Sequence, residues 1–83
     1  MSTLDLLADA VSRYKREGRR GIDWTFMHMA DADRLKFDGF LVQTKDPLAW
    51  QAGTVESRFK ARVLAMALNR PAVNDAGLMD LSD

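Results

Sequence analysis

Near the N-terminus, apolar residues recur every three or four positions, which is the period of one face of an α-helix. The pattern predicts a first helix over residues 3–17. Ser2 followed three residues later by Asp5 is typical of the capping box that begins a helix. Gly18 stands where a left-handed residue commonly ends one, so both ends of this element are marked.

The helical period returns near the other end of the chain. Thr54 is a suitable N-cap, and a helix is predicted from there to the stop signals Asn69 and Pro71. Its segment 63–68 is apolar almost all round, which indicates burial on two sides or contact with a partner. Before this helix, the pair Asp46-Pro47 predicts the start of one short helical turn.

Between these helices, from Gly21 onward, the period of the apolar residues changes to two. Ile22, Trp24 and Phe26 alternate with Asp23 and Thr25. Strict alternation is typical of a strand with one face on the core. We therefore expect a strand over residues 22–29.

The sharpest local signal is Asp38-Gly39, flanked by residues 34–37 and 40–43. This pattern is typical of a β-hairpin with a two-residue type I′ turn. In that register four large apolar side chains share one face, as the pairs Phe37–Phe40 and Leu35–Val42. The competing interpretation is one helix over residues 31–42, which places a glycine in the helix interior at a cost in stability. The hairpin is our prediction.

Together these elements predict an α+β fold of two layers, with an N-terminal helix, a three-stranded antiparallel meander and a C-terminal helix. The length allows one small core, so residues 1–71 are expected to form a single compact domain. The stretch 72–83 carries three acidic residues and no basic one. It is expected to be an acidic, flexible tail.

The chain has no cysteine, which excludes disulfides, thiolate metal sites and a cysteine nucleophile. A small domain without these aids can gain stability by self-association, so a homo-oligomer is one expectation. No apolar stretch approaches the length of about 20 residues that spans a bilayer. No membrane partner and a cytoplasmic location are expected.

Candidate catalytic groups are few. His28 is the single histidine, so a zinc site of the usual kind has too few ligands. A base near neutral pH also needs a nucleophile or substrate pocket beside it, and His28 is interpreted as a residue at the edge of the core. Asp31 and Asp33 do not fit a calcium loop, because Leu35 and Lys36 occupy its fifth and sixth positions. We expect no enzyme activity, no cofactor and no metal.

The strongest charged feature is a run of basic residues at the end of the first helix, in which Glu17 is the one acid. Guanidinium groups pair well with phosphates and carboxylates, so the run is a candidate clamp for either. The alternative is a solvated helix end, whose cations complement the helix dipole. Basic residues of the last helix extend the candidate surface, and a tryptophan in the short turn is a candidate anchor. The predicted partner-binding residues are Arg13, Lys15, Arg16, Arg19, Arg20, Trp50, Arg58 and Arg62.

These features favour a small, non-enzymatic protein–protein interaction module. The net charge is zero, yet basic and acidic segments are separated along the chain. We expect such a module to self-associate or to dock on a larger complex as an accessory protein or a phage-type, viral inhibitor. The alternative is a nucleic-acid-binding protein that uses the basic helix ends. Zero net charge and the lack of a helix-turn-helix signature count against that alternative.

Overall fold

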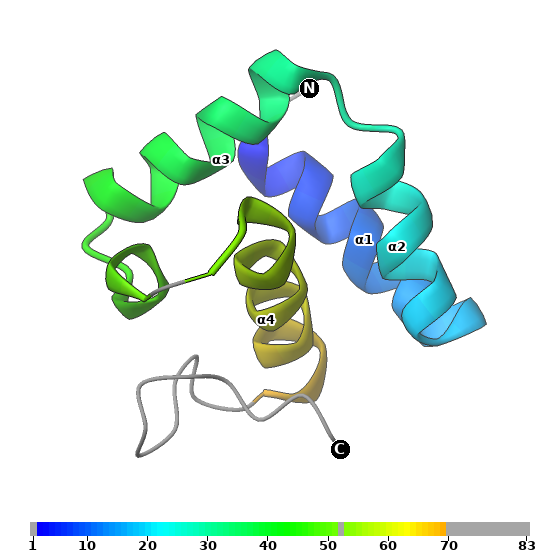
Figure 1. The fold of residues 1–83 in the computed structure, drawn as a ribbon. Helices are drawn as coiled ribbons and strands as arrows, with labels where there is room; N and C mark the ends of the chain where they lie inside the picture. The colour runs from blue at the N-terminus through cyan, green and yellow to red at the C-terminus, as the bar shows by residue number, and fades with distance from the viewer. Residues whose placement is uncertain (1, 52, 70–83) are drawn as a thin grey trace.

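A computed structural model describes residues 2–51 and 53–69 of the chain. This part of the chain forms four α-helices and one short 3₁₀ helix (Figure 1). In chain order the elements are α1 (Thr3–Glu17), α2 (Arg19–Met27), α3 (Asp31–Gln43), η1 (Pro47–Trp50) and α4 (Val55–Leu68). Helices α1 and α2 form an antiparallel hairpin, α3 runs along the opposite side, and α4 lies between them. The expected tail, residues 72–83, lies outside the described residues.

The predicted ends of the first and last helices, α1 and α4, are confirmed. The Ser2 hydroxyl accepts from the Asp5 N–H at 3.1 Å, and the Asp5 carboxylate accepts from the Ser2 N–H at 3.2 Å. This carboxylate has a lowered pKa, because the hydrogen bonds from Ser2 favour its charged form. Gly18 ends α1 with a positive φ of 72°, but its ψ of −153° lies outside the left-handed helical region that was expected. Thr54 begins α4 with a second capping box, and Asn69 ends it in the left-handed conformation.

The prediction of a strand over residues 22–29 was wrong, because this segment lies mostly in α2. The residues that α2 and the turn after it bury are Gly21, Ile22, Thr25 and Met29, which follow a helical spacing. Two of them, Gly21 and Thr25, are small or polar and hide that spacing from a hydrophobicity pattern. Trp24, which the strand placed on the core face, keeps 44% of its surface exposed.

The hairpin at Asp38-Gly39 was also wrong, and the competing helix is the element present. Helix α3 buries Phe37 and Leu41 one turn apart, while Leu35 and Val42 are 72% and 55% exposed. Gly39 faces open space and costs the helix about 1 kcal/mol relative to alanine. Burial of the two large side chains contributes about 1.5 to 3 kcal/mol each, which outweighs the glycine. The described residues contain no strand, so the fold is all-helical and not α+β.

The core forms around α4, which packs against every other element. Phe59 of α4 lies at its centre, with ring centroids 5.4 Å from Phe37 and 5.6 Å from Phe26. Buried residues of α4 contact apolar side chains of the other elements, including Leu7, Ile22, Leu41 and Leu48. The apolar end of α4 is largely used in this core, because Val63, Leu64 and Ala65 are buried.

Candidate binding surfaces

The basic residues of α4 point to carboxylates of the domain itself. Each one ties α4 to a different element: Arg58 to Asp38 of α3 at 3.0 Å, Lys60 to Asp23 of α2 at 2.9 Å, and Arg62 to Asp46 before η1. The pair with Asp23 raises the pKa of Lys60. The Arg58 and Arg62 side chains are only 16% and 20% exposed. The structure therefore places these two predicted partner-binding residues in internal ion pairs, so their charges are largely compensated within the domain.

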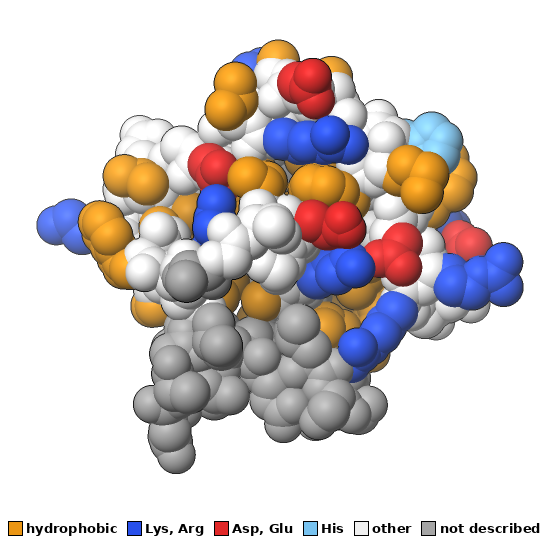
Figure 2. All heavy atoms as spheres, viewed as in Figure 1, with side chains coloured by type: hydrophobic (Ala, Val, Ile, Leu, Met, Phe, Trp, Pro, Cys, Tyr) orange, Lys and Arg blue, Asp and Glu red, His pale blue; other side chains and the backbone are white. Residues whose placement is uncertain are grey.

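The basic residues at the end of α1 instead lie together around one exposed turn. Lys15 and Arg16 lie in the last turn of α1, and Arg19 and Arg20 lie in the first turn of α2. We call these four exposed residues the cationic tip. At the right edge of the molecule in Figure 2, blue Lys or Arg side chains lie over this turn with a red acidic side chain beside them.

The cationic tip rests on a close contact between its two helices. A Cβ atom on Gly21 would lie 2.5 Å from the backbone carbonyl of Arg13, so only glycine lets α2 approach α1 this closely. Arg13 itself pairs with Asp9 at 3.0 Å and is half-buried. The hairpin therefore holds the four cations on a tightly packed base.

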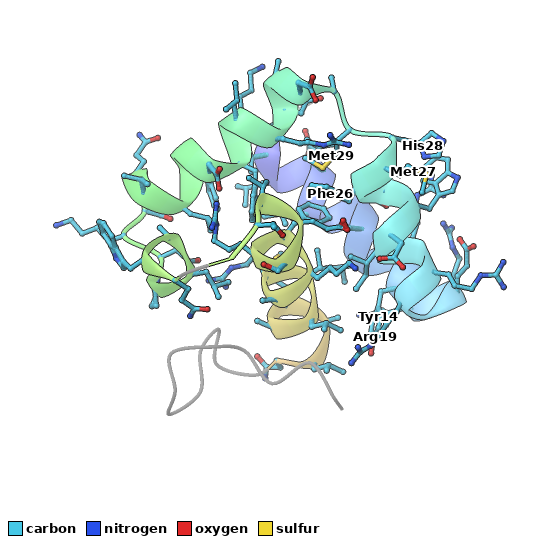
Figure 3. All side chains as sticks on the ribbon, viewed as in Figure 1. Tyr14, Arg19, Phe26, Met27, His28 and Met29 are labelled. Carbon is cyan, nitrogen blue, oxygen red and sulfur yellow. The ribbon has the colours of Figure 1, made fainter. Side chains whose placement is uncertain are left out.

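Beside the tip, three planar side chains stack on the outer side of the hairpin. The Arg13 guanidinium lies 4.0 Å from the centre of the Trp24 ring, and the His28 ring stacks on the same indole at 4.0 Å. His28 Nδ1 donates to the Trp24 carbonyl at 2.8 Å, which fixes its ring. Met27 and His28 lie together at the outer end of α2 (Figure 3). We call Arg13, Trp24 and His28 the planar stack.

A separate apolar groove lies where α1, α3, η1 and α4 meet. Its volume is about 430 Å³, and its apolar lining includes Leu4, Phe40 and Met66. Leu4 and Met66 are 59% and 41% exposed. The exposed Lys45 and the Arg62–Asp46 pair add charge to the lining.

Lys45 stands in an unusual backbone conformation at this groove. Its φ is 55°, in the left-handed region. Its N–H donates to Val42 and the Asp46 N–H donates to Leu41, which together form the Schellman motif at the end of α3. Glycine is the usual residue at this position, and a side chain there costs about 1 kcal/mol.

Two other features give weaker support for a binding surface. Trp50 is 72% exposed at the end of η1, as a partner anchor requires, but it does not line the groove. A hollow of about 460 Å³ between α2, α3 and α4 is lined by Asp23, Glu56 and Lys60 among others. Lys60 lies 2.9 Å from one of these carboxylates and 3.7 Å from the other, so the charges in that hollow largely compensate each other.

Residues 2–51 and 53–69 bring together no group of three or more metal-ligating side chains. The single histidine, His28, is hydrogen-bonded to the Trp24 carbonyl. None of the helices in that part of the chain combines the length and apolar character needed to cross a membrane. No known protein family, curated protein or solved structure matches the chain. The geometry of the surfaces is thus the basis for assigning a function.

The run of basic residues in the sequence indicated the cationic tip. The planar stack and the groove were not predicted from the sequence. The alternating pattern predicts instead that Trp24 and His28 follow the core face of a strand. Arg20, Trp24 and His28 recur every four residues, and this spacing was the available signal for an exposed helix face. The groove combines residues from four elements, so no local pattern could indicate it.

Proposed function

We propose that this protein is a non-enzymatic protein-binding module, and that the apolar groove receives a segment of a partner protein. The observation that supports this most directly is the exposure of Leu4 and Met66 in one groove of about 430 Å³. Solvent-facing apolar side chains that line a shared concave surface are typical of docking sites. The cytoplasmic location expected from the sequence stays a prediction.

The chemistry of the groove defines the partner segment. The apolar lining fits a leucine-like or methionine-like side chain, and Lys45 at the groove fits a neighbouring carboxylate. The left-handed backbone at Lys45 supports this role. Glycine would relieve the strain there but would remove the cation. The partner segment we propose therefore carries an apolar residue close to an acidic one.

Two blocked peptides test this chemistry directly. Both contain one leucine, and they differ in having glutamate or lysine one helical turn away. We expect the glutamate peptide to shift the NMR signals of the Met66 methyl group and the Lys45 amide more than the lysine peptide does. The variant Lys45→Glu should reverse this preference. Equal shifts with both peptides, or an unchanged preference in the variant, would overturn the proposal.

A matched pair of variants tests the groove in cells. Leu4→Gln changes the groove lining, whereas Leu35→Gln changes an exposed leucine on the outer face of α3. Cross-linking from the native cell should recover a specific partner with the wild-type protein and with Leu35→Gln, and lose it with Leu4→Gln. Loss with both variants or with neither would place the contact elsewhere. Circular dichroism of each variant confirms that the helices are intact.

A further inference from the structure

The outer side of the α1–α2 hairpin combines two kinds of group, exposed cations and stacked planar side chains. The cationic tip presents exposed ammonium and guanidinium groups, and the planar stack begins one helical turn further along α2. Arg20, Trp24 and His28 are all exposed and recur every four residues, so they follow one stripe of α2. Arg13 and Arg16 lie one turn apart on α1. The contact of Arg13 with Trp24 places this part of α1 beside the exposed stripe of α2.

From this juxtaposition we propose that the outer side of the hairpin binds single-stranded nucleic acid. The phosphates lie on the cationic tip, and one or two bases stack on the planar groups around Trp24. This surface is distinct from the apolar groove and does not depend on the protein-binding function proposed above.

The planar stack favours nucleic acid over an acidic protein surface. Carboxylates need only the cations, whereas unpaired bases stack on aromatic rings, imidazoles and guanidinium planes. The Arg13 guanidinium and the His28 ring each lie 4.0 Å from the indole and cover its two faces, so the stack is preorganised and a base adds to its open end, on the exposed His28 ring. Met27, 71% exposed at the same end of α2, adds apolar surface for a base edge.

The helix arrangement favours a single strand over a duplex. In a helix-turn-helix, two consecutive helices joined by a turn of about three or four residues cross at a steep angle, and the second helix enters the major groove. Helices α1 and α2 are instead antiparallel and joined by Gly18 alone. Helices α2 and α3 follow one another, but no Cα atom of α2 lies within 8 Å of one in α3. A hairpin tip with adjacent planar groups instead matches a strand whose bases are unstacked and accessible.

A labelled oligodeoxythymidylate of about 12 nucleotides is the probe for this surface. Binding is measured by fluorescence anisotropy over a salt series. Three phosphate contacts, to Lys15, Arg16 and Arg20, give a slope of log K against log salt of about −2. Affinity should therefore fall roughly 20-fold between about 50 and 200 mM salt. No binding at low salt would overturn the proposal.

Variants separate the two parts of the surface. Arg20→Glu should weaken binding and make the salt slope shallower, because a phosphate contact is lost. Trp24→Leu keeps apolar bulk but removes the ring, and it should weaken binding at least about fivefold with the slope unchanged. Lys36→Glu, an exposed charge reversal on α3, is the control and should change neither value.

Polyglutamate distinguishes nucleic acid from an acidic protein partner. It should compete with the oligonucleotide only weakly at equal charge concentration, because it offers no bases to the planar stack. Competition as strong as that of unlabelled oligonucleotide, together with full binding by Trp24→Leu, would show a surface for acidic proteins. That result would overturn the nucleic-acid assignment even if the cationic tip is the contact.

Discussion

Helix α4 and the α1–α2 turn carry similar sets of basic residues but direct them in opposite ways. On α4, Arg58 and Arg62 reach aspartates 20 and 16 positions earlier in the chain and are largely covered. At the cationic tip, Lys15, Arg16 and Arg20 are exposed. A basic helix in a sequence is therefore not yet a binding surface. What decides is whether the fold brings carboxylates from other elements to the same place.

The largest effect should come from breaking the Asp46 junction. One Asp46 oxygen accepts from the Leu48 N–H at 3.0 Å, and the other pairs with Arg62. The Asp46 side chain is only 10% exposed, so Asp46→Ala leaves a guanidinium without its partner and η1 without its cap. We expect the free energy of unfolding to fall by about 3 kcal/mol, measured by chemical denaturation.

A second ion pair of α4 is the control for Asp46→Ala. Lys60 and Asp23 are 35% and 51% exposed, so solvent screens their attraction. Lys60→Gln should therefore cost less than about 1 kcal/mol. A loss for Lys60→Gln as large as that for Asp46→Ala would contradict the view that burial sets the strength of these ties.

The base of the cationic tip should show the next largest effect. In Gly21→Ala, the new methyl group meets the Arg13 backbone at 2.5 Å and must push α1 and α2 apart. We expect a loss of about 2 kcal/mol in thermal or chemical unfolding. The distorted hairpin should also bind the oligonucleotide more weakly.

Gly39→Ala provides the matched control, because a Cβ on Gly39 meets no atom within 4 Å. The same substitution should here raise the stability of the protein by about 1 kcal/mol, through the helix propensity of alanine. Destabilisation at both glycines would show that close packing is not the cause at Gly21.

The two glycines also explain how far the sequence allowed the fold to be predicted. Helix α1, η1 and α4 were predictable because their caps are local, such as Ser2 with Asp5. Helix α2 was not, since its buried face contains Gly21 and Thr25, which a hydrophobicity pattern does not count. For α3, the Asp38-Gly39 pair resembles a turn, but Asp38 binds Arg58 and Gly39 faces solvent.

The candidate surfaces follow the same division. The cationic tip could be predicted because its residues are adjacent in the sequence and Gly18 marks the turn between them. The internal role of Arg58 and Arg62 could not be predicted, because their partners come from α3 and from the segment before η1. Exposed apolar residues such as Leu35 and Val42 resembled core residues, and only the packing of α3 shows which face is buried.

The smallest expected effect is a change in the free energy of unfolding whose sign differs between the cationic tip and α4. Helix α2 begins at Gly18 without a side-chain cap, and its first turn has arginines and no acidic residue. Cations are unfavourable at this positive end of the helix dipole. Arg20→Glu should therefore raise the free energy of unfolding by about 0.5 kcal/mol at low salt, and the gain should shrink as salt is added.

The corresponding charge reversal on α4 should have the opposite effect on stability. Arg58→Glu places a second carboxylate beside Asp38 in a half-buried site and should destabilise the protein by more than 1 kcal/mol. Calorimetry of both variants at two salt concentrations measures the contrast. A stable Arg20→Glu that has lost the oligonucleotide would show that the tip retains its arginine for binding at a small cost in stability. A destabilised Arg20→Glu would instead indicate that this arginine supports the fold, as those of α4 do.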